Sequence, residues 1–187
     1  MGNSTLTTVR DARQDDARAL AAVAAATFPL ACPPTTTAEA KADFIATHLS
    51  EARFGDYLGD AARSILIAEQ DGVIVGYSML VFDEPSDADV RSVVLRRPAA
   101  ELSKFYILPD RHGGGVARIL MEASVRVAAE RGADSVWLGV NQSNGRANRF
   151  YEKSGFDKVG TRRFLVGASW ESDFVREHVL VGVDSDR

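Results

Sequence analysis

Two mostly hydrophobic segments with a polar turn between them predict a β-hairpin in the first half of the chain. Two segments rich in β-branched and aromatic residues, Ser64 to Glu69 and Val73 to Phe82, are separated only by Gln70-Asp71-Gly72. An Asp-Gly pair between such segments is typical of a type I′ turn, whose two central residues need a positive φ. The sequence therefore predicts an antiparallel pair here, and Thr5 to Val9 alternates enough to form a further strand.

Apolar residues at helical spacing predict two helices before this hairpin. The first begins at Ala17, after the capping and acidic residues Gln14-Asp15-Asp16, and we expect the prolines from Pro29 onward to end it. The second begins at the capping box Thr36-Thr37-Ala38-Glu39 and stops near Gly55. Helices thus precede the main part of the sheet.

The middle of the chain contains a polar connector followed by a strand, a helix and another strand. The connector runs from Asp83 to Pro98, with a short strand at Val93 to Leu95 as an open alternative, and Glu101 to Leu108 is the strand that follows it. A helix from Gly115 to Arg131-Gly132 then leads to a strand at Ser135 to Val140.

This order of strand, helix and strand predicts a right-handed parallel crossover. We therefore expect Phe105 to Leu108 to lie beside Val136 to Val140. The remaining pattern predicts a helix at Asn144 to Ser154, ended by Gly155. A closing hairpin follows; its strands are expected at Asp157 to Val166 and Asp173 to Val181, with a turn at Gly167 to Ser172.

A glycine-rich turn joins the strand that ends at Leu108 to the helix that follows it. The turn reads Pro109-Asp110-Arg111-His112-Gly113-Gly114-Gly115. Glycines let the main chain wrap closely around a ligand, and the first N–H groups of the next helix have no partner inside that helix. Since these groups also form the positive end of the helix dipole, the sequence predicts an anion site that suits a pyrophosphate.

Composition narrows the class of protein. The chain has 187 residues, 45% hydrophobic and 26% charged, which predicts one globular domain with a sizeable core. Its formal net charge of -4 argues against a nucleic-acid binder, and its apolar segments are too short to span a membrane. The single cysteine, Cys32, excludes an internal disulfide and favours the reducing cytoplasm. No metal site is predicted, because His48 and His178 lack companions at ligand spacing.

Two motifs in order resemble the GNAT superfamily of N-acetyltransferases. The segment from His112 to Ala117 is similar to that family's phosphate turn, except that His112 stands where the family has Gln or Arg. The segment from Asn144 to Phe156 resembles the family's Asn-x-x-Ala-x-x-x-Tyr-x-x-x-Gly-Phe helix. The resemblance implies an α/β (α+β) fold. It comprises a mixed sheet of six to seven strands, an antiparallel N-terminal part, a splayed parallel pair at the cofactor site and about four flanking helices.

The resemblance also implies acetyl-CoA as the acetyl donor. Main-chain groups of Phe105 and Ile107 would meet the acetyl and pantetheine end, and amides of the glycine turn would meet the pyrophosphate. Gly139 would ease the approach of pantetheine, although a tolerated strand glycine explains it equally well. The implied CoA-binding residues are Phe105, Tyr106, Ile107, His112, Gly113, Gly114, Gly115, Val116, Ala117, Arg118, Asn144, Tyr151 and Lys153.

Two catalytic residues follow from the same resemblance. Tyr151 falls where family members protonate the leaving CoA thiolate, and Glu101 is the candidate base that removes a proton from the attacking ammonium. Water could serve instead of Glu101, which is equally well explained as a solvated carboxylate at a strand start. By contrast, Phe150, Phe156 and Trp137 are expected to be core residues, and Arg162-Arg163 a strand edge or solvated face.

The acceptor is expected to be a small molecule with a primary amine. The segment Val136 to Val140, the Tyr151 helix and the turn from Phe164 to Gly167 loosely resemble the PaiA-type polyamine acetyltransferases of bacteria. Acidic residues could pair with the ammonium groups of a polyamine, or could merely solvate the surface. The alternatives are a protein or peptide N-acetyltransferase and a non-catalytic acyl-CoA sensor; a homodimer is also possible. The acidic candidates are Asp56, Asp83, Glu84, Asp87 and Asp89.

Overall fold

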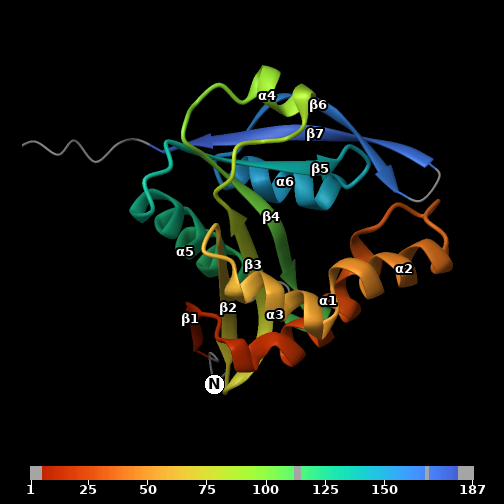
Figure 1. The fold of residues 1–187 in the computed structure, drawn as a ribbon, viewed down its shortest axis with the longest axis vertical. Coiled ribbons are helices and arrows are strands. Elements are labelled where there is room, and N and C mark those ends of the chain that lie inside the picture. The colour runs from red at the N-terminus through yellow and green to blue at the C-terminus, as the bar shows by residue number, and fades with distance from the viewer. Residues whose placement is uncertain (1–5, 112–114, 167–168, 181–187) are drawn as a thin grey trace, which may run out of the picture. The chain divides into compact units, whose positions relative to one another are not determined.

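The computed structural model describes residues 6–111, 115–166 and 169–180, and Figure 1 shows the order of its elements. The chain divides into two compact units. The first unit consists of Met1–Leu80 and Lys104–Ser124, and the second of Val81–Ser103 and Val125–Arg187. We describe each unit by itself.

Seven strands make up the sheet within the described ranges, in the hydrogen-bonded order β1-β2-β3-β4-β5-β7-β6. Strands β4 and β5 run parallel, whereas the β1/β2, β5/β7 and β6/β7 pairs are antiparallel. This mixed sheet with its helices confirms the predicted fold class. The strands are β1 (Thr7–Asp11), β2 (Arg63–Gln70), β3 (Val73–Val81), β4 (Ala99–Ile107), β5 (Ser135–Asn141), β6 (Asp157–Val166) and β7 (Ser169–Val179).

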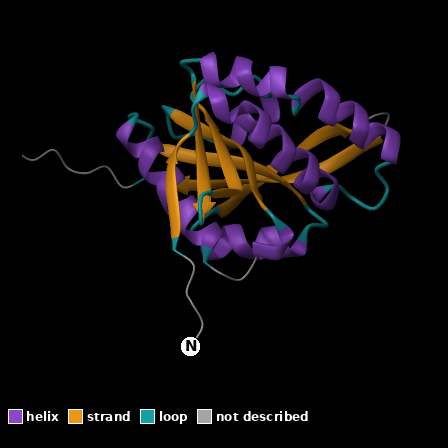
Figure 2. Cartoon of the chain, turned by 90° about the horizontal axis from the view of Figure 1, so that it is seen from below, coloured by secondary structure: helices purple, strands orange, loops and turns teal. Residues whose placement is uncertain are grey.

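Six α-helices accompany the sheet within the described residues, two more than expected, and short loops join most of the elements (Figure 2). Not one of the described helices has both the length and the apolar character needed to span a membrane. The helices are α1 (Ala17–Ala31), α2 (Ala38–His48), α3 (Glu51–Gly59), α4 (Ala88–Val93), α5 (Val116–Glu130) and α6 (Gly145–Lys153), with 3-10 turns at Gln14–Asp16 and Pro109–Arg111.

The first unit confirms the predicted hairpin. Asp71 and Gly72 join β2 to β3 with φ values of 51° and 76°, the positive pair that a type I′ turn requires. Behind these strands, Leu20 of α1, Phe54 of α3 and Tyr77 of β3 are fully buried. This part of the core therefore lies between α1, α3 and the hairpin, and α2 contributes no buried residue to it.

One helix prediction in the first unit is wrong. Helix α1 contains Pro29 and ends at Ala31, inside the proline segment expected to end it, and Cys32 before Pro33 has an extended backbone. The single helix predicted up to Gly55 is two helices. Ser50 adopts an extended conformation and accepts a hydrogen bond from the Arg53 N–H at 3.3 Å, so it starts α3, which runs past Gly55 to Gly59.

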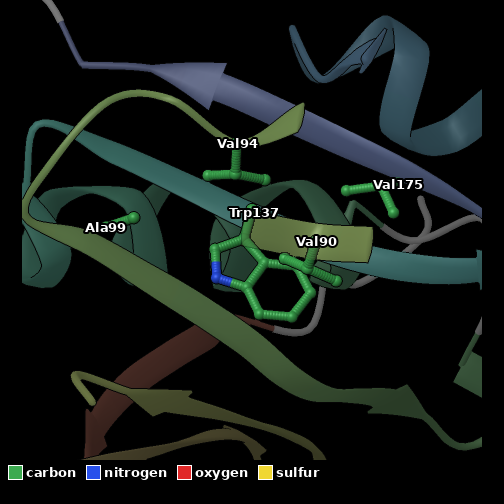
Figure 3. Packing of buried hydrophobic residues seen from close by; sticks show 5 residues of the cluster. All are labelled: Val90, Val94, Ala99, Trp137 and Val175. Carbon is green, nitrogen blue, oxygen red and sulfur yellow. The ribbon is translucent and has the colours of Figure 1, made fainter. Parts of the chain in front are cut away.

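The connector in the second unit contains a helix rather than the short strand considered at Val93 to Leu95. The Asp87 side chain accepts a hydrogen bond from the Asp89 N–H at 2.8 Å and caps α4. Val90 and Val94 are four residues apart, so their side chains lie on the same side of the helix, and both are fully buried. Figure 3 shows them packed over Trp137.

The parallel pair forms at a different place from the one predicted. Strand β5 pairs with the first residues of β4, Ala99↔Ser135 through Glu101↔Trp137, and not with Phe105 to Leu108. A crossover helix returns the chain to the end of the sheet where the first strand began, so parallel strands start together. In the closing hairpin, β7 starts at Ser169 rather than Asp173, since pairing with β6 continues to Val166↔Ser169.

Candidate functional site

The start of α5 in the first unit has the geometry of an anion site. Gly115 has a φ of +78°, and the first described intrahelical bond runs from the Ile119 N–H to the Gly115 carbonyl at 3.0 Å. The amides of Val116, Ala117 and Arg118 therefore precede the first N–H that the helix itself can satisfy. They also lie at the positive end of its dipole. The predicted contacts His112, Gly113 and Gly114 lie outside the described residues.

Side chains around this helix start differ in what they can offer a ligand. Val116 is buried and fixes the helix on its unit, and Ala117 is half-buried. Arg118 is exposed and pairs with Glu122 at 2.8 Å, one turn further along. Exposed pairs of this kind are weak, so the Arg118 guanidinium can exchange Glu122 for an anion at little cost.

The end of β4 lies in the same unit. Phe105 and Tyr106 are half-buried and Ile107 is buried. Successive residues of a strand point to opposite faces, so Phe105 and Ile107 share one face while Tyr106 occupies the other. Burial raises the pKa of Tyr106 to about 12, which keeps its phenol protonated at neutral pH.

In the second unit, Asn144 acts as the N-cap of α6. Its side-chain oxygen accepts a hydrogen bond from the Ala147 N–H at 3.1 Å. The cap occupies this oxygen, so the amide nitrogen of Asn144 is the group left for a ligand. Capping α6 is thus a second explanation for Asn144 beside the predicted contact with the cofactor. The sequence motif alone does not distinguish these two roles.

Tyr151 sits on α6 among aromatic rings. It is half-buried, with ring centroids of Phe150 and Phe156 at 5.5 and 6.0 Å. Phe156 is fully buried, as expected, whereas Phe150 is only half-buried. Lys153 is exposed in the last turn of the same helix.

A buried arginine fixes α6 to β7. Arg176 donates hydrogen bonds to the side-chain oxygen of Asn148 and to the carbonyl of Phe156, both at 3.0 Å. Asn148 in turn donates to the carbonyls of Asn141 and Asn144. Sequence reasoning missed both residues, since an arginine three residues before the end of β7 carries no signal of burial.

Glu101 lies in a row of side chains across the second unit. It is half-buried on β4, and the strand register sets it opposite Trp137, which is in turn opposite Glu177. Trp137 is a core residue, as predicted, with 3% of its surface exposed. Glu101 therefore lies next to Trp137 across the sheet, and its role as a base stays a prediction.

Arg162 lies on β6, an edge strand of the described sheet, so the strand-edge alternative is confirmed for it and the solvated face is wrong. Its side chain is 15% exposed and pairs with the 8% exposed carboxylate of Asp173 at 3.4 Å. A Cβ at Gly139 would lie 2.5 Å from the Arg162 Cζ, so the open face of this glycine is occupied by the guanidinium. Burial raises the pKa of Asp173 despite this partner. A strand glycine can indicate such a close approach, but it does not identify the partner.

Residues 6–111, 115–166 and 169–180 contain no group of three His, Cys, Asp or Glu side chains placed to hold a metal ion. Chemically, the described residues instead offer main-chain donors at a helix start, a strand end, a half-buried phenol and a half-buried carboxylate. Together with the mixed sheet, these groups are typical of an enzyme that binds an anionic cofactor and transfers an acyl group.

Comparison with known proteins identifies the family. The sequence model of the Acetyltransferase (GNAT) family matches residues 26–156. A Mycobacterium tuberculosis protein described as an uncharacterized N-acetyltransferase is 52% identical over 166 residues, which cover 89% of this chain and 99% of the relative. The chain belongs to the GNAT family, and it is an N-acetyltransferase. The resemblance derived from the two sequence motifs is thereby confirmed.

Solved structures share the fold at low sequence identity. The PaiA N-acetyltransferase from Thermoplasma acidophilum, solved with coenzyme A, has a TM-score of 0.73 and 18% identity, covering 94% of this chain and 99% of its own. A ribosomal-protein-alanine N-acetyltransferase from Brucella melitensis has a TM-score of 0.63 and 23% identity, covering 92% and 99%. At these identities the likeness concerns the fold alone.

Proposed function

We propose that this enzyme transfers the acetyl group of acetyl-CoA to the primary amine of a small molecule by direct attack, without a covalent enzyme intermediate. The start of α5 is the observation that carries the proposal. A positive φ at Gly115 and the amides of residues 116–118, which have no hydrogen-bond partner among the described residues, fit the pyrophosphate of CoA. Acetyl-CoA supplies the activated thioester. The cytoplasm is the proposed location, supported by the single cysteine.

The main chain at the end of β4 is proposed to polarise the thioester carbonyl. The described β4/β5 register ends at Glu101↔Trp137, before Phe105 and Ile107. Fixed main-chain dipoles stabilise a developing oxyanion without reorganising, an effect of about 3 kcal/mol for a well-placed donor. Phe105 and Ile107 supply these groups.

Two side chains are proposed to move protons. The Tyr151 hydroxyl donates its proton to the departing thiolate, and its half-buried setting among aromatic rings supports this role. The Glu101 carboxylate, or a water molecule, removes a proton from the attacking ammonium. Asn144 and Lys153 would hold the cofactor beside them.

A polyamine acceptor has less support than it had in the sequence. Of the acidic residues that could bind it, Asp56 pairs with Arg53, Glu84 with Arg97, and Asp87 caps α4. These roles are structural. The first proposal is therefore a small-molecule acceptor of unstated charge, handled by a single-domain enzyme that could form a homodimer.

Calorimetry with CoA-free protein tests the cofactor site, and α5 offers a matched pair of variants. Gly115 and Gly132 flank this helix, both have a φ near 80°, and a Cβ at either position would meet nothing within 4 Å. Gly115→Asp and Gly132→Asp therefore share backbone strain and added charge. Only Gly115→Asp should weaken CoA binding, because it sets a carboxylate against the pyrophosphate. Equal affinities, or no CoA binding by the wild type at millimolar concentration, would refute the site.

Thiol release with a panel of amines and peptides tests catalysis. Tyr151→Phe should lower kcat about 100-fold, the effect expected for loss of a general acid, while the Kd for CoA stays unchanged. Unchanged turnover would remove Tyr151 from the mechanism. Binding of CoA without thiol release for any acceptor would favour the non-catalytic sensor, and release with peptides alone would favour a protein-modifying enzyme.

A further inference from the structure

Cationic and phenolic side chains gather in the first unit, between α3 and the strands β2 to β4. We define the tyrosine–cation cluster as Tyr57, Tyr77, Tyr106, Arg63 and Lys104. Around the Tyr57 ring, the Arg63 Cζ lies 4.8 Å and the Lys104 Nζ 5.5 Å from the centroid. The Cζ of Arg53 adds a third cation at 5.9 Å.

Aromatic packing joins the cluster to the end of β4. The Tyr77 ring lies 5.7 Å from Tyr106 and 5.5 Å from the buried ring of Phe54. Lys104 and Tyr106 point to the same face of β4 because they are two residues apart, and they flank Phe105 in the sequence. The cluster therefore borders the main chain that we propose contacts the thioester.

One member of the cluster lacks the hydrogen bond that its burial demands. Tyr77 is fully buried, and its hydroxyl has no hydrogen-bond partner among the described residues. Burial raises the pKa of Tyr77 well above its usual value, with smaller effects from Tyr106 and Tyr57. The Tyr57 hydroxyl already donates to the His48 carbonyl at 3.2 Å. A buried hydroxyl without a partner is costly, so the site favours an oxygen acceptor supplied from outside the chain.

The electrostatic field at the cluster is positive. The pKa of His48 is lowered by burial and by the charges of Lys104 and Arg53. Asp56 pairs with Arg53 and Asp60 pairs with Arg63, and these carboxylate side chains are 67% and 40% exposed. Water screens both carboxylates, so they offset the cations only in part.

We propose that the tyrosine–cation cluster binds a negatively charged oxygen group, a carboxylate or a phosphate, carried by the amine acceptor. Lys104 and Arg63 provide charge and Tyr77 provides the hydrogen bond. The acceptor is then an amine with an anionic group a few carbon atoms away, rather than a polyamine. This inference rests on the proposed function, since it names the acceptor class of the same site.

Matched primary amines test this inference. In steady-state thiol release, 4-aminobutanoate and 3-aminopropyl phosphate should have a kcat/KM at least about tenfold above that of butylamine, which should exceed that of 1,4-diaminobutane. The two anions distinguish carboxylate from phosphate. A diamine that equals or exceeds the anionic amines would overturn the proposal.

Variants assign the effect to the cluster. Lys104→Gln and Arg63→Gln should each lower kcat/KM for the preferred anionic amine about tenfold, mainly through KM, and leave butylamine nearly unchanged. Arg126→Gln removes an exposed α5 cation that pairs only weakly, at 3.9 Å, with Glu130, and serves as the control with the same change in net charge. Equal losses for butylamine and the anionic amine would contradict a role in anion recognition.

A binding experiment keeps the inference testable if turnover of these amines is too slow. The N-acetylated products of 4-aminobutanoate and butylamine are titrated by NMR into protein saturated with CoA. The anionic product should bind more tightly, and Lys104→Glu should reverse this order. Equal binding, or none, would overturn the inference, while loss of CoA binding itself would instead refute the proposed function.

Discussion

The tyrosine–cation cluster of the first unit differs from the polar residues of β5, β6 and β7 in the second unit in its balance of charge. In the second unit, Arg162 pairs with Asp173, and both side chains are largely buried. Buried polar atoms there that have no hydrogen-bond partner among the described residues include the donors Ser135 Oγ and Trp137 Nε1 and the acceptor Glu177 Oε1. In the first unit, the groups around Tyr57 are cations and phenols.

This difference indicates a structural role for the polar residues of the second unit and a binding role for the tyrosine–cation cluster. Donors and acceptors of the second unit lie at neighbouring register positions, so a single buried water could join them without a ligand. The cluster gathers cations and phenols around the Tyr57 ring, and the buried Tyr77 hydroxyl has no hydrogen-bond partner among the described residues, so a bound molecule or water can supply the acceptor that it lacks. Removing a group should therefore destabilise the second unit and affect mainly binding in the first.

The largest effect is expected from Arg162→Met. This change leaves the Asp173 carboxylate buried without its partner, which should lower the free energy of unfolding by about 3 kcal/mol, measured by urea denaturation at pH 7. The double variant Arg162→Met/Asp173→Leu should recover most of the loss because no isolated charge is left. Additive losses in the double variant would show that the pair is not the unit of stability.

Gly139→Ala should have the next largest effect. The new Cβ would lie 2.5 Å from the Arg162 Cζ and would displace a guanidinium that Asp173 holds in place. We expect a loss of about 1–2 kcal/mol in the free energy of unfolding, which a thermal or urea melt would detect. Combined with Arg162→Met, the glycine change should cost much less; an undiminished cost would assign Gly139 to another contact.

Tyr77→Phe should act in the opposite direction on stability. It removes a buried hydroxyl that has no partner among the described residues, so unliganded protein should gain up to about 1 kcal/mol. Tyr57→Phe is the matched variant; it loses a real hydrogen bond to the His48 carbonyl and should be destabilised slightly. Loss of stability in Tyr77→Phe would indicate that the hydroxyl is already satisfied within the protein.

The smallest effect concerns pH. The pKa of His48 is lowered in the folded protein, so the unfolded chain binds the proton more readily. Stability from this residue is present above its ordinary pKa of about 6.5 and is lost as the pH falls below that value. His48→Gln should flatten the decline in unfolding free energy between pH 7 and pH 5. An unchanged slope would show that the positive field at the cluster is weak.

Local sequence signals were sufficient to predict the turns and helix starts that depend only on neighbouring residues. The Asp71-Gly72 turn, the glycine start of α5 and the helix predicted at Asn144 to Ser154 each depend on residues within one turn or helix, and the structure has all of them. The α4 helix was missed because a six-residue helix offers less than two turns of periodicity. The start of β5 beside Ala99, rather than Phe105, depends on where a strand begins, which is the weakest part of any such prediction.

The polar clusters depend on contacts between distant segments and were therefore missed. The contact of Arg162 with Gly139 and Asp173 requires the register of three strands. Tyr57, Tyr77 and Lys104 come from α3, β3 and β4, and no spacing within one element joins them. The roles of Tyr151 and Glu101 stay predictions, because a motif match places a residue in the fold but does not show that it transfers a proton.

Gly76 on β3 lies against β4, the strand that we propose contacts the acetyl donor. A Cβ at this position would lie 2.8 Å from the Tyr106 carbonyl oxygen and 3.3 Å from the Ile107 Cα. A side chain introduced at residue 76 would therefore push on the backbone of β4. If β4 binds the thioester as proposed, small increments of volume at residue 76 would reposition it, which makes this residue a remote site for laboratory evolution of acyl-chain length.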